Sequence, residues 1–309
     1  MDTVVDVDRL HKRYGGVTAV EEVTFSVRRG EIFGILGPNG AGKTTTVECL
    51  QGLRSRDGGT VSVLGLDPDR DADRLRRRTG SQLQSSALPE RLRVGEAVAL
   101  FASRLDGDGG ALSSLSTLDE WGLTPLRRRA YATLSGGQRQ RLFFALALLG
   151  KPEVVFLDEL TTGLDPVARR ATWDLVRGVR DRGATVVLVT HFMEEAEALC
   201  DRIAIVDSGR LVALDTPAAL AGRHGGAVRT TFTAPGLDVG FLHQVSNVDE
   251  VRVDGDRVVV TGDHRSTVTV AAALAARGIV PDDYRTHHPT LEDVFLALTG
   301  RSLAEGAPR

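Results

Sequence analysis

The stretch EIFGILGPNGAGKTTT, residues 31–46, decides the fold of this chain. It opens with an apolar run at residues 32–36 that predicts a buried strand, and the pattern Gly-x-x-x-x-Gly-Lys-Thr follows at residues 37–44. A helical segment comes next. A strand, a glycine-rich loop and a helix in this order bind phosphate through backbone N–H groups and the helix N-terminus. The stretch therefore predicts a nucleoside triphosphate site.

The side chains of this loop match that chemistry. Glycines let backbone N–H groups turn toward the β-phosphate without a Cβ in the way. Lys43 can reach the β- and γ-phosphates, and the Thr44 hydroxyl can bind Mg²⁺. The competing interpretation is an ordinary glycine-rich turn before a helix. A chance match is rare, because Lys12 and Lys151 are the only other lysines of the chain.

Length and composition describe an ordinary globular protein. The chain has 309 residues, enough for one large domain and a smaller one. Its 42% hydrophobic and 26% charged residues are usual for folded proteins. The formal net charge is −3, whereas nucleic-acid-binding domains are normally clearly basic. No nucleic-acid partner is therefore expected.

Neither the cysteines nor the apolar segments indicate a special environment. Cys49 and Cys200 follow no disulfide or metal pattern, so both are expected to be small buried residues in a reducing compartment. Residues 1–10 carry early acids and no apolar core, unlike a signal peptide. No run approaches the roughly 18 apolar residues of a membrane span. Any membrane role is expected to come through a partner.

Alternating strands and helices continue to about residue 222. The apolar runs at residues 154–157 and 185–190 are typical of parallel strands buried on both faces. Helical segments separate them, which predicts a mainly parallel α/β sheet. After residue 225 the pattern changes to short alternating strands, with a hairpin turn at residues 254–255. Residues 223–309 are therefore expected to form a small α+β accessory domain.

Two acids follow one of these buried strands. Asp158 and Glu159 end the run at residues 154–157, and open α/β sheets bind ligands beyond the carboxyl ends of their strands. Asp158 is suited to the Mg²⁺ shell, and Glu159 to polarising a water for attack on the γ-phosphate. His191 ends the next strand, at the same edge of the sheet. Taken alone, a histidine is more often structural than catalytic. Gln84 taken alone is more often a solvated side chain, and Tyr14 taken alone is more often a core residue.

A second anion-binding element lies at residues 135–138, Ser-Gly-Gly-Gln, at the start of an apolar helix. A serine and two glycines at a helix N-terminus form a nest of backbone N–H groups. One γ-phosphate needs one such nest, and the loop at residues 37–44 already supplies it. The second nest therefore predicts that a second copy of the chain closes over the nucleotide.

The sequence LSGGQRQR at residues 134–141, between GPNGAGKTT and VVFLDELTTGLDP, resembles the ATPase cassette of ABC transporters. The resemblance covers about residues 3–222. It implies a P-loop NTPase fold with a mainly parallel core sheet, an antiparallel β subdomain and a helical subdomain at about residues 85–150. The domains expected are thus the cassette, residues 1–222, and the accessory domain, residues 223–309.

The resemblance also implies roles for single residues. Glu159, His191 and Gln84 would act in catalysis, and Thr44, Gln84 and Asp158 would hold Mg²⁺. Gln82 is a competing choice for Gln84. ATP would contact Tyr14, Gly37, Pro38, Asn39, Gly40, Ala41, Gly42, Lys43, Thr44, Thr45, Ser135, Gly136, Gly137 and Gln138. Asp165 would lie in a loop at the dimer contact.

One position departs from the family pattern. Leu160 stands where the family usually has proline, directly after Glu159. A proline there would hold Glu159 extended, because the residue before proline is restricted to extended backbone. We therefore expect leucine to loosen the carboxylate and to slow hydrolysis without abolishing binding.

The tail narrows the branch of the family. PTLEDVFLALTGR at residues 289–301 resembles the daunorubicin-resistance type of exporter ATPase. That resemblance implies a homodimer of cassettes that drives a separate integral-membrane permease, on the cytoplasmic side of the membrane, and exports drugs, antibiotics or lipids. ATP and Mg²⁺ are the ligands implied.

Other functions remain as alternatives. A soluble ABC ATPase acting on ribosomes or nucleic acid usually has tandem cassettes or long insertions, which this sequence lacks. A GTPase or small-molecule kinase fits poorly, because no Asn-Lys-x-Asp motif is present. A regulatory module that binds ATP without turnover is at odds with the intact Glu159.

Overall fold

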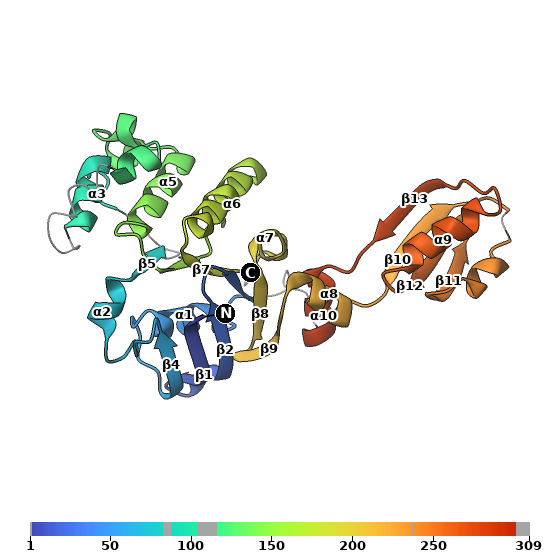
Figure 1. The fold of residues 1–309 in the computed structure, drawn as a ribbon, viewed down its shortest axis with the longest axis horizontal. Helices are drawn as coiled ribbons and strands as arrows, with labels where there is room; N and C mark the ends of the chain where they lie inside the picture. Colours follow the sequence, from blue (N-terminus) through green and yellow to red (C-terminus); the bar gives the residue numbers. More distant parts are fainter. Residues whose placement is uncertain (1, 83–87, 104–115, 237, 301–309) are drawn as a thin grey trace. The chain divides into compact units, whose positions relative to one another are not determined.

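The computed structural model describes residues 2–82, 88–103, 116–236 and 238–300. The chain forms two compact units, one of residues up to Pro217 and one from Ala218 onward. The first unit contains a six-stranded and a three-stranded sheet, and the second a four-stranded sheet (Figure 1). The division along the chain falls between Pro217 and Ala218, whereas the sequence predicts it between residues 222 and 223.

The six-stranded sheet is the centre of the first unit. In spatial order its strands are β5 (Thr79–Gln82), β6 (Val154–Asp158), β7 (Thr185–Thr190), β3 (Ile32–Leu36), β8 (Arg202–Asp207) and β9 (Arg210–Asp215). The first five are parallel, and β9 runs antiparallel to β8. Every residue of β3, β6 and β7 is buried, as their apolar sequences predict for strands covered on both faces. The predicted mainly parallel core sheet is confirmed.

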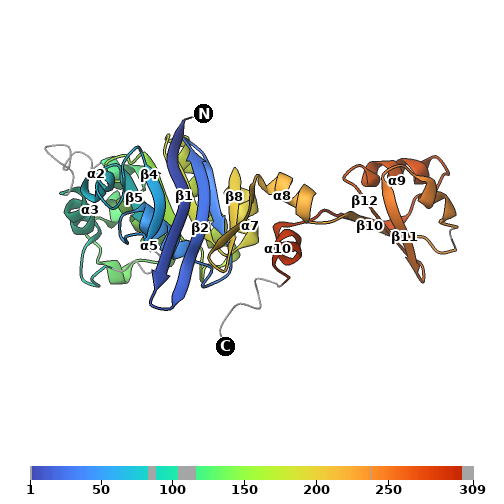
Figure 2. The same cartoon turned by 90° about the horizontal axis from the view of Figure 1, so that it is seen from below.

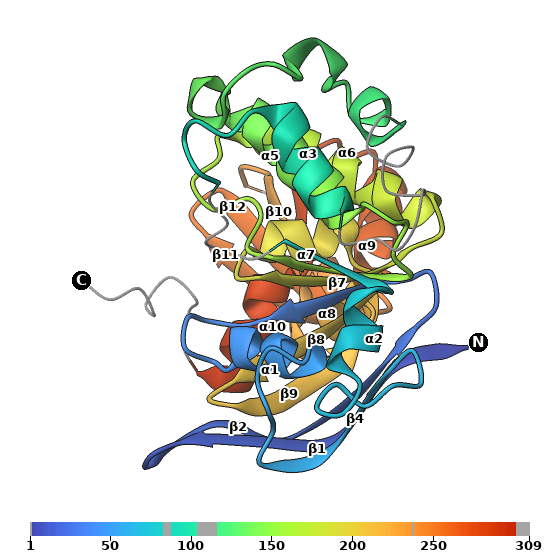
Figure 3. The ribbon, with the colours of Figure 1, turned by 90° about the vertical axis from the view of Figure 1, so that its left-hand side faces the viewer.

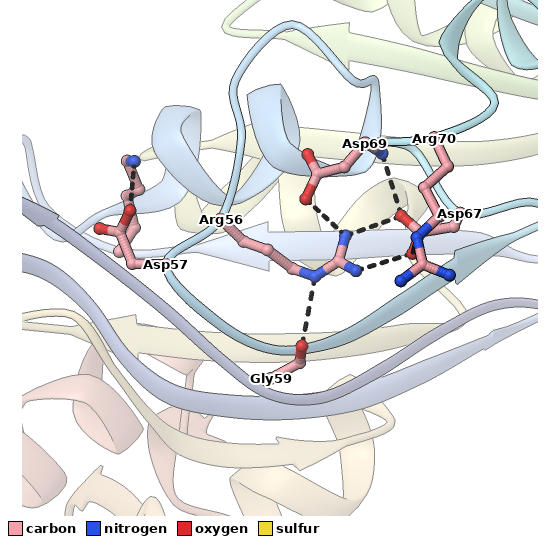
Figure 4. Close-up of polar contacts among 7 residues, drawn as sticks. Arg56, Asp57, Gly59, Asp67, Asp69 and Arg70 are labelled. Atoms are coloured by element: carbon pink, nitrogen blue, oxygen red, sulfur yellow. Dashed lines mark hydrogen bonds and ion pairs between the residues drawn. The ribbon is translucent and has the colours of Figure 1, made fainter.

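The antiparallel subdomain is a three-stranded sheet in the order β2-β1-β4 (Figure 2). Its strands are β1 (Thr3–Tyr14), β2 (Val17–Arg28) and β4 (Gly58–Val63). A polar cluster fixes the ends of β4 (Figure 4). The Arg56 guanidinium donates two hydrogen bonds to Asp67, at 2.9 and 2.8 Å, and one to the Gly59 carbonyl at 3.2 Å. Asp69 pairs with the same guanidinium at 2.8 Å.

Helices cover both faces of the six-stranded sheet (Figure 3). In the first unit they include α1 (Lys43–Leu50), α2 (Ala72–Arg76), α3 (Val94–Ala102), α5 (Gly136–Ala147), α6 (Pro166–Asp181) and α7 (Met193–Leu199), with the 3₁₀ turns η1 (Thr124–Leu126) and η2 (Tyr131–Thr133). The chain leaves α5 well before Pro152. The helix already ends at Ala147, and Gly150 and Lys151 then turn the chain with positive φ values of 77° and 53°.

The second unit is an antiparallel sheet with the order β11-β12-β10-β13. The helix α8 (Pro217–His224) begins one residue before it. Its other elements are β10 (Val228–Thr233), η3 (Gly240–Gln244), β11 (Val248–Asp254), β12 (Arg257–Gly262), α9 (Ser266–Ala275), β13 (Asp282–His287) and α10 (Leu291–Thr299). Its core contains Phe232, Val260 and Leu274. A capping box begins α10, because Thr290 Oγ1 accepts from the Asp293 N–H and the Asp293 carboxylate accepts from the Thr290 N–H.

No helix in the described part of the chain is both long and apolar enough to span a membrane.

Candidate active site

The phosphate loop between β3 and α1 is held by backbone from two other strands. A Cβ at Gly37 would lie 2.1 Å from the Val206 carbonyl oxygen, and a Cβ at Gly42 would lie 2.3 Å from the Ala19 carbonyl oxygen. Gly42 also has a φ of 95° at the N-cap of α1, which favours glycine. Gly209 N–H donates to the Ala41 carbonyl at 3.0 Å. Both motif glycines are therefore required by close backbone contacts.

Lys43 is buried inside this loop. Its Nζ donates to the carbonyls of Gly37 and Pro38, at 2.8 and 2.9 Å, and lies 4.0 Å from Glu159 Oε1. Burial lowers the pKa of Lys43, and the charges of Glu159 and Asp158 oppose that shift. The lysine thus joins the loop to the acids at the end of β6.

Asp158 is the last residue of β6 and is only 3% exposed. Thr44 Oγ1 donates to its Oδ2 at 3.3 Å, whereas its buried Oδ1 has no hydrogen-bond partner among the described residues. Burial, reinforced by the Glu159 charge, raises the pKa of Asp158 to about 6. A hydroxyl beside a carboxylate with a buried, unpartnered oxygen fits Mg²⁺, which prefers hard oxygen ligands.

Glu159 and His191 meet at the ends of β6 and β7. His191 Nδ1 lies 3.2 Å from Glu159 Oε1, and the Glu159 side chain is 7% exposed. The Glu159 N–H donates to the Val189 carbonyl at 2.9 Å. Its φ of 48° lies in the left-handed region, so its backbone is not extended. The structure thus brings together the lysine, the threonine, both acids and the histidine that the sequence singled out.

The segment Ser135–Gln138 forms the N-terminus of α5. Ser135 Oγ accepts from the Gln138 N–H at 3.3 Å, and Gln138 Oε1 accepts from the Ser135 N–H at 3.0 Å. Ser135 and the two glycines after it are exposed. Among the described residues, no hydrogen bond or ion pair joins this segment to the phosphate loop. A side chain further along α5, Gln140, donates to the Leu160 carbonyl at 3.4 Å.

The remaining candidates from the sequence are Tyr14, Gln84 with its competitor Gln82, and Asp165. Tyr14 ends β1 and is 39% exposed, and the Arg54 guanidinium lies over its ring, 5.0 Å from the ring centroid. Gln84 falls outside the described residues, and its competitor Gln82 is a buried residue of β5. Asp165 caps the N-terminus of α6 and accepts from two backbone N–H groups at 2.9 Å.

One buried acid near the site has no counterpart in the sequence prediction. Glu195 of α7 is 1% exposed, and its Oε1 accepts from the indole N–H of Trp173 at 3.1 Å. The run MEEAEAL gives no sign of this burial, because acids in the first turns of a helix are usually solvated. Only the packing of α6 on α7 distinguishes Glu195 from its neighbours.

A sheet that positions a phosphate loop and two acids in this way is that of an ATP-hydrolysing cassette. The chain matches the ABC transporter family over residues 20–162. The ATP-binding subunit of an ABC transporter described below also shares 30% sequence identity with it, and the chain belongs to this family as an ABC-type ATPase. The predictions of family, fold class and ATPase activity are confirmed.

Curated relatives match almost the complete chain. The daunorubicin resistance ATP-binding protein DrrA3 of Streptomyces coeruleorubidus is 38% identical, over 97% of this chain and 96% of its own length. A Nod factor export ATP-binding protein I of Ralstonia nicotianae is 35% identical, over 98% of this chain and 95% of its own length. The linearmycin resistance ATP-binding protein LnrL of Bacillus subtilis is 33% identical, over 98% and 100%.

Solved structures match the first unit's fold. An ATP-binding subunit of an ABC transporter has a TM-score of 0.63 and 30% sequence identity, over 71% of this chain and 92% of that one. The cbiO1 protein of Clostridium perfringens, part of the ABC transporter complex cbiONQ, has a TM-score of 0.64 and 26% identity, over 72% and 92%.

Proposed function

We propose that this chain is the ATP-hydrolysing subunit of an exporter whose membrane permease is a separate chain. The observation that carries the proposal is the full-length match to ATP-binding proteins of daunorubicin resistance, linearmycin resistance and Nod factor export. The match includes the second unit as well as the cassette. We place the chain at the cytoplasmic face of the membrane, bound there through its permease.

Two cassettes would close head-to-tail on two ATP molecules. The phosphate loop, Gly37 to Thr45, would bind the phosphates from one chain while Tyr14 stacks on the adenine. The exposed helix start, Ser135 with Gly136, Gly137 and Gln138, would close over the same nucleotide from the other chain. This proposal is supported by the exposure of Ser135, Gly136 and Gly137, which a second copy of the chain can therefore reach. Closure and reopening of the dimer would drive the permease between two states.

The residues at the ends of β6 and β7 would carry out the chemistry. Glu159 would accept a hydrogen bond from the attacking water and take its proton, and His191, 3.2 Å away, would hold the carboxylate in place. Lys43 would place its charge against the β- and γ-phosphates. Mg²⁺ would be held by Thr44, Gln84 and Asp158, and when bound it neutralises charge on the phosphates.

The names of the relatives indicate only a broad class of exported compound. Their names describe resistance to daunorubicin and linearmycin, and export of Nod factor. We propose export of a drug, antibiotic or lipid. The separate permease would select the cargo.

Replacing the proposed base tests the mechanism. Glu159→Gln removes the proton acceptor and keeps the shape, so we expect it to bind ATP, to lose hydrolysis by about a hundredfold or more, and to accumulate as an ATP-bound dimer. Steady-state hydrolysis and size-exclusion chromatography with ATP measure both effects. Glu197→Gln, at an exposed position on α7, is the matched control.

A monomeric Glu159→Gln variant that hydrolyses ATP at the wild-type rate would contradict this mechanism. The transport assignment has its own test, which is co-purification from detergent-solubilised membranes. Recovery with ribosomes or DNA instead would favour the soluble, non-transport ABC ATPase.

A further inference from the structure

Glu195 is a buried carboxyl that the proposed chemistry does not use. It lies one turn after His191, on α7, and its Oε1 accepts from the Trp173 indole N–H of α6. Burial raises the pKa of Glu195, while the hydroxyls of Thr190 and Thr161 and the Trp173 N–H act in the opposite direction. Burying a carboxyl is unfavourable unless its environment compensates. A specific role at this position is therefore expected.

The groups around Glu195 belong to the two segments that carry the hydrolytic pair. Thr161 is fully buried two residues after Glu159, and Thr190 directly precedes His191. Thr190 Oγ1 also accepts from the Phe192 N–H at 3.0 Å, which fixes the backbone on the other side of His191. The Glu195 carboxyl thus interacts with a hydroxyl from each of these two segments.

The link from Glu195 continues into α6. This helix begins at Pro166, directly after Asp165 at its N-cap, and Trp173 lies two turns further on. Arg169 of the same helix lies over the Phe192 ring, 4.5 Å from its centroid, and pairs with Glu194 at 3.7 Å. Two side chains of α6 therefore contact the segment that follows His191.

Oε2 of Glu195 and Oγ1 of Thr161 are both buried without a well-formed hydrogen bond within the described residues. Leaving buried polar atoms in this state costs free energy. A second arrangement of α6 or of the Thr161 segment that completed these hydrogen bonds would recover that cost. Poorly satisfied groups at a packed interface are suited to an element with two arrangements.

We propose that Glu195 and Trp173 are positioning residues, which couple the orientation of α6 to the placement of the Glu159–His191 pair. Movement of α6 as two chains close would shift the carboxyl through the indole N–H. The carboxyl would then move the segments of Thr161 and Thr190, and with them the catalytic glutamate and the histidine. The inference rests on the roles proposed above for Glu159 and His191.

Conservative variants test the coupling. Trp173→Phe keeps a ring and removes the N–H donor, and we expect it to lower kcat about fivefold to tenfold. The KM for ATP should stay within about twofold, because the phosphate loop is untouched. Glu195→Gln keeps an acceptor for the indole and should retain most of the activity, whereas Glu195→Leu should resemble Trp173→Phe. Trp121→Phe, at the only other tryptophan, and Glu197→Gln are the matched controls.

Thermal unfolding separates coupling from plain packing. If Trp173→Phe lowers Tm but leaves kcat unchanged, the residue is only structural and the proposal is overturned. If kcat falls while Tm and KM hold, the proposal stands. The double variant Trp173→Phe/Glu195→Leu should lose little more kcat than either single variant, since both changes break the same link. Additive losses would overturn the link.

Fluorescence gives a readout that does not depend on turnover. The Trp121→Phe variant leaves Trp173 as its sole tryptophan, so its emission reports the Glu195 contact directly. We expect the emission to change when MgATP binds to this variant carrying Glu159→Gln. Unchanged emission under saturating MgATP would overturn the coupling. Failure of the proposed function would look different, because Glu159→Gln would then hydrolyse ATP normally.

Discussion

Glu159 has a φ of 48°, in a region of backbone space that is uncommon for residues with a Cβ. Proline at position 160 would favour extended backbone at Glu159, and Leu160 imposes no such restriction. The carboxylate is nevertheless not loose, because it is buried and lies close to His191 and Lys43. Leucine at position 160 therefore leaves the carboxylate in place but allows a strained backbone at Glu159. Such strain is of the order of 1–3 kcal/mol.

Restoring the proline should therefore change turnover. We expect Leu160→Pro to raise kcat roughly fivefold, the equivalent of about 1 kcal/mol of released strain. Binding of ATP should change little. Steady-state hydrolysis against ATP concentration measures both, with Leu160→Met as a control that keeps the buried volume and the free backbone. A variant with the wild-type rate would contradict this expectation.

Tyr14 allows a separate test of adenine binding. The residue is partly exposed, and the Arg54 guanidinium lies over its ring. Loss of a stacking platform costs about 1–3 kcal/mol, so we expect Tyr14→Ala to raise the KM for ATP about tenfold with kcat largely kept. Tyr14→Phe should match the wild type, because stacking needs the ring and not the hydroxyl. An equal effect of both changes would argue against stacking.

At the residue scale, the sequence predicts the site residues that lie in one continuous motif or come at the end of a recognisable strand. The loop at Gly37–Thr44 and the strand-end residues Asp158, Glu159 and His191 are of this kind, and the structure brings them together. Glu195 could not be predicted, because its burial depends on the contact between α6 and α7. The left-handed φ of Glu159 could not be predicted either, since no glycine or asparagine marks it.

Among the secondary-structure elements, apolar pattern decides what the sequence predicts. β6 and β7 were predicted from continuous apolar runs, and both are present. β13, with the sequence DDYRTH, was not predicted because its side chains are polar and no residue of it is fully buried. It forms because β10 offers it an unpaired edge. Tertiary pairing thus overrides local preference there.

The polar cluster at β4 predicts a pH dependence of stability. The hydrogen bonds from Arg56 lower the pKa of Asp67 to about 2, below its ordinary value of 3.8. A carboxyl with a lowered pKa stabilises the fold above its unfolded pKa, and that contribution is lost as pH falls from about 4 to about 2. At pH 7 we expect Asp67→Asn to reduce the free energy of unfolding by about 1–2 kcal/mol.

Urea unfolding at several pH values checks this contribution. The gap between the wild type and Asp67→Asn should narrow below about pH 4, because protonation removes the same charge. Asp73→Asn is the matched control, since its pairing with Arg76 is at the surface and its side chain is 86% exposed. A gap that stays constant with pH would show that the charge of Asp67 does not matter.

On the scale of the whole molecule, the two compact units lead to a truncation experiment. We propose that the second unit contributes to contact between two cassettes. The chain shortened to residues 1–217 should fold and bind ATP, because all six strands of the main sheet lie within it. In the Glu159→Gln background it should lose most of the ATP-dependent dimer, as measured by size-exclusion chromatography. An undiminished dimer would assign the unit another role.

Sheet order also determines when this chain can begin to work during its synthesis. β3, which carries the phosphate loop, emerges from the ribosome early, but its neighbours in the sheet are β7 and β8. At roughly 5–20 residues per second, these arrive on the order of ten seconds later. The Val206 and Gly209 backbone against the loop arrives last. A nascent chain would therefore have its nucleotide-binding motif exposed yet incomplete, which gives chaperones a defined interval in which to act.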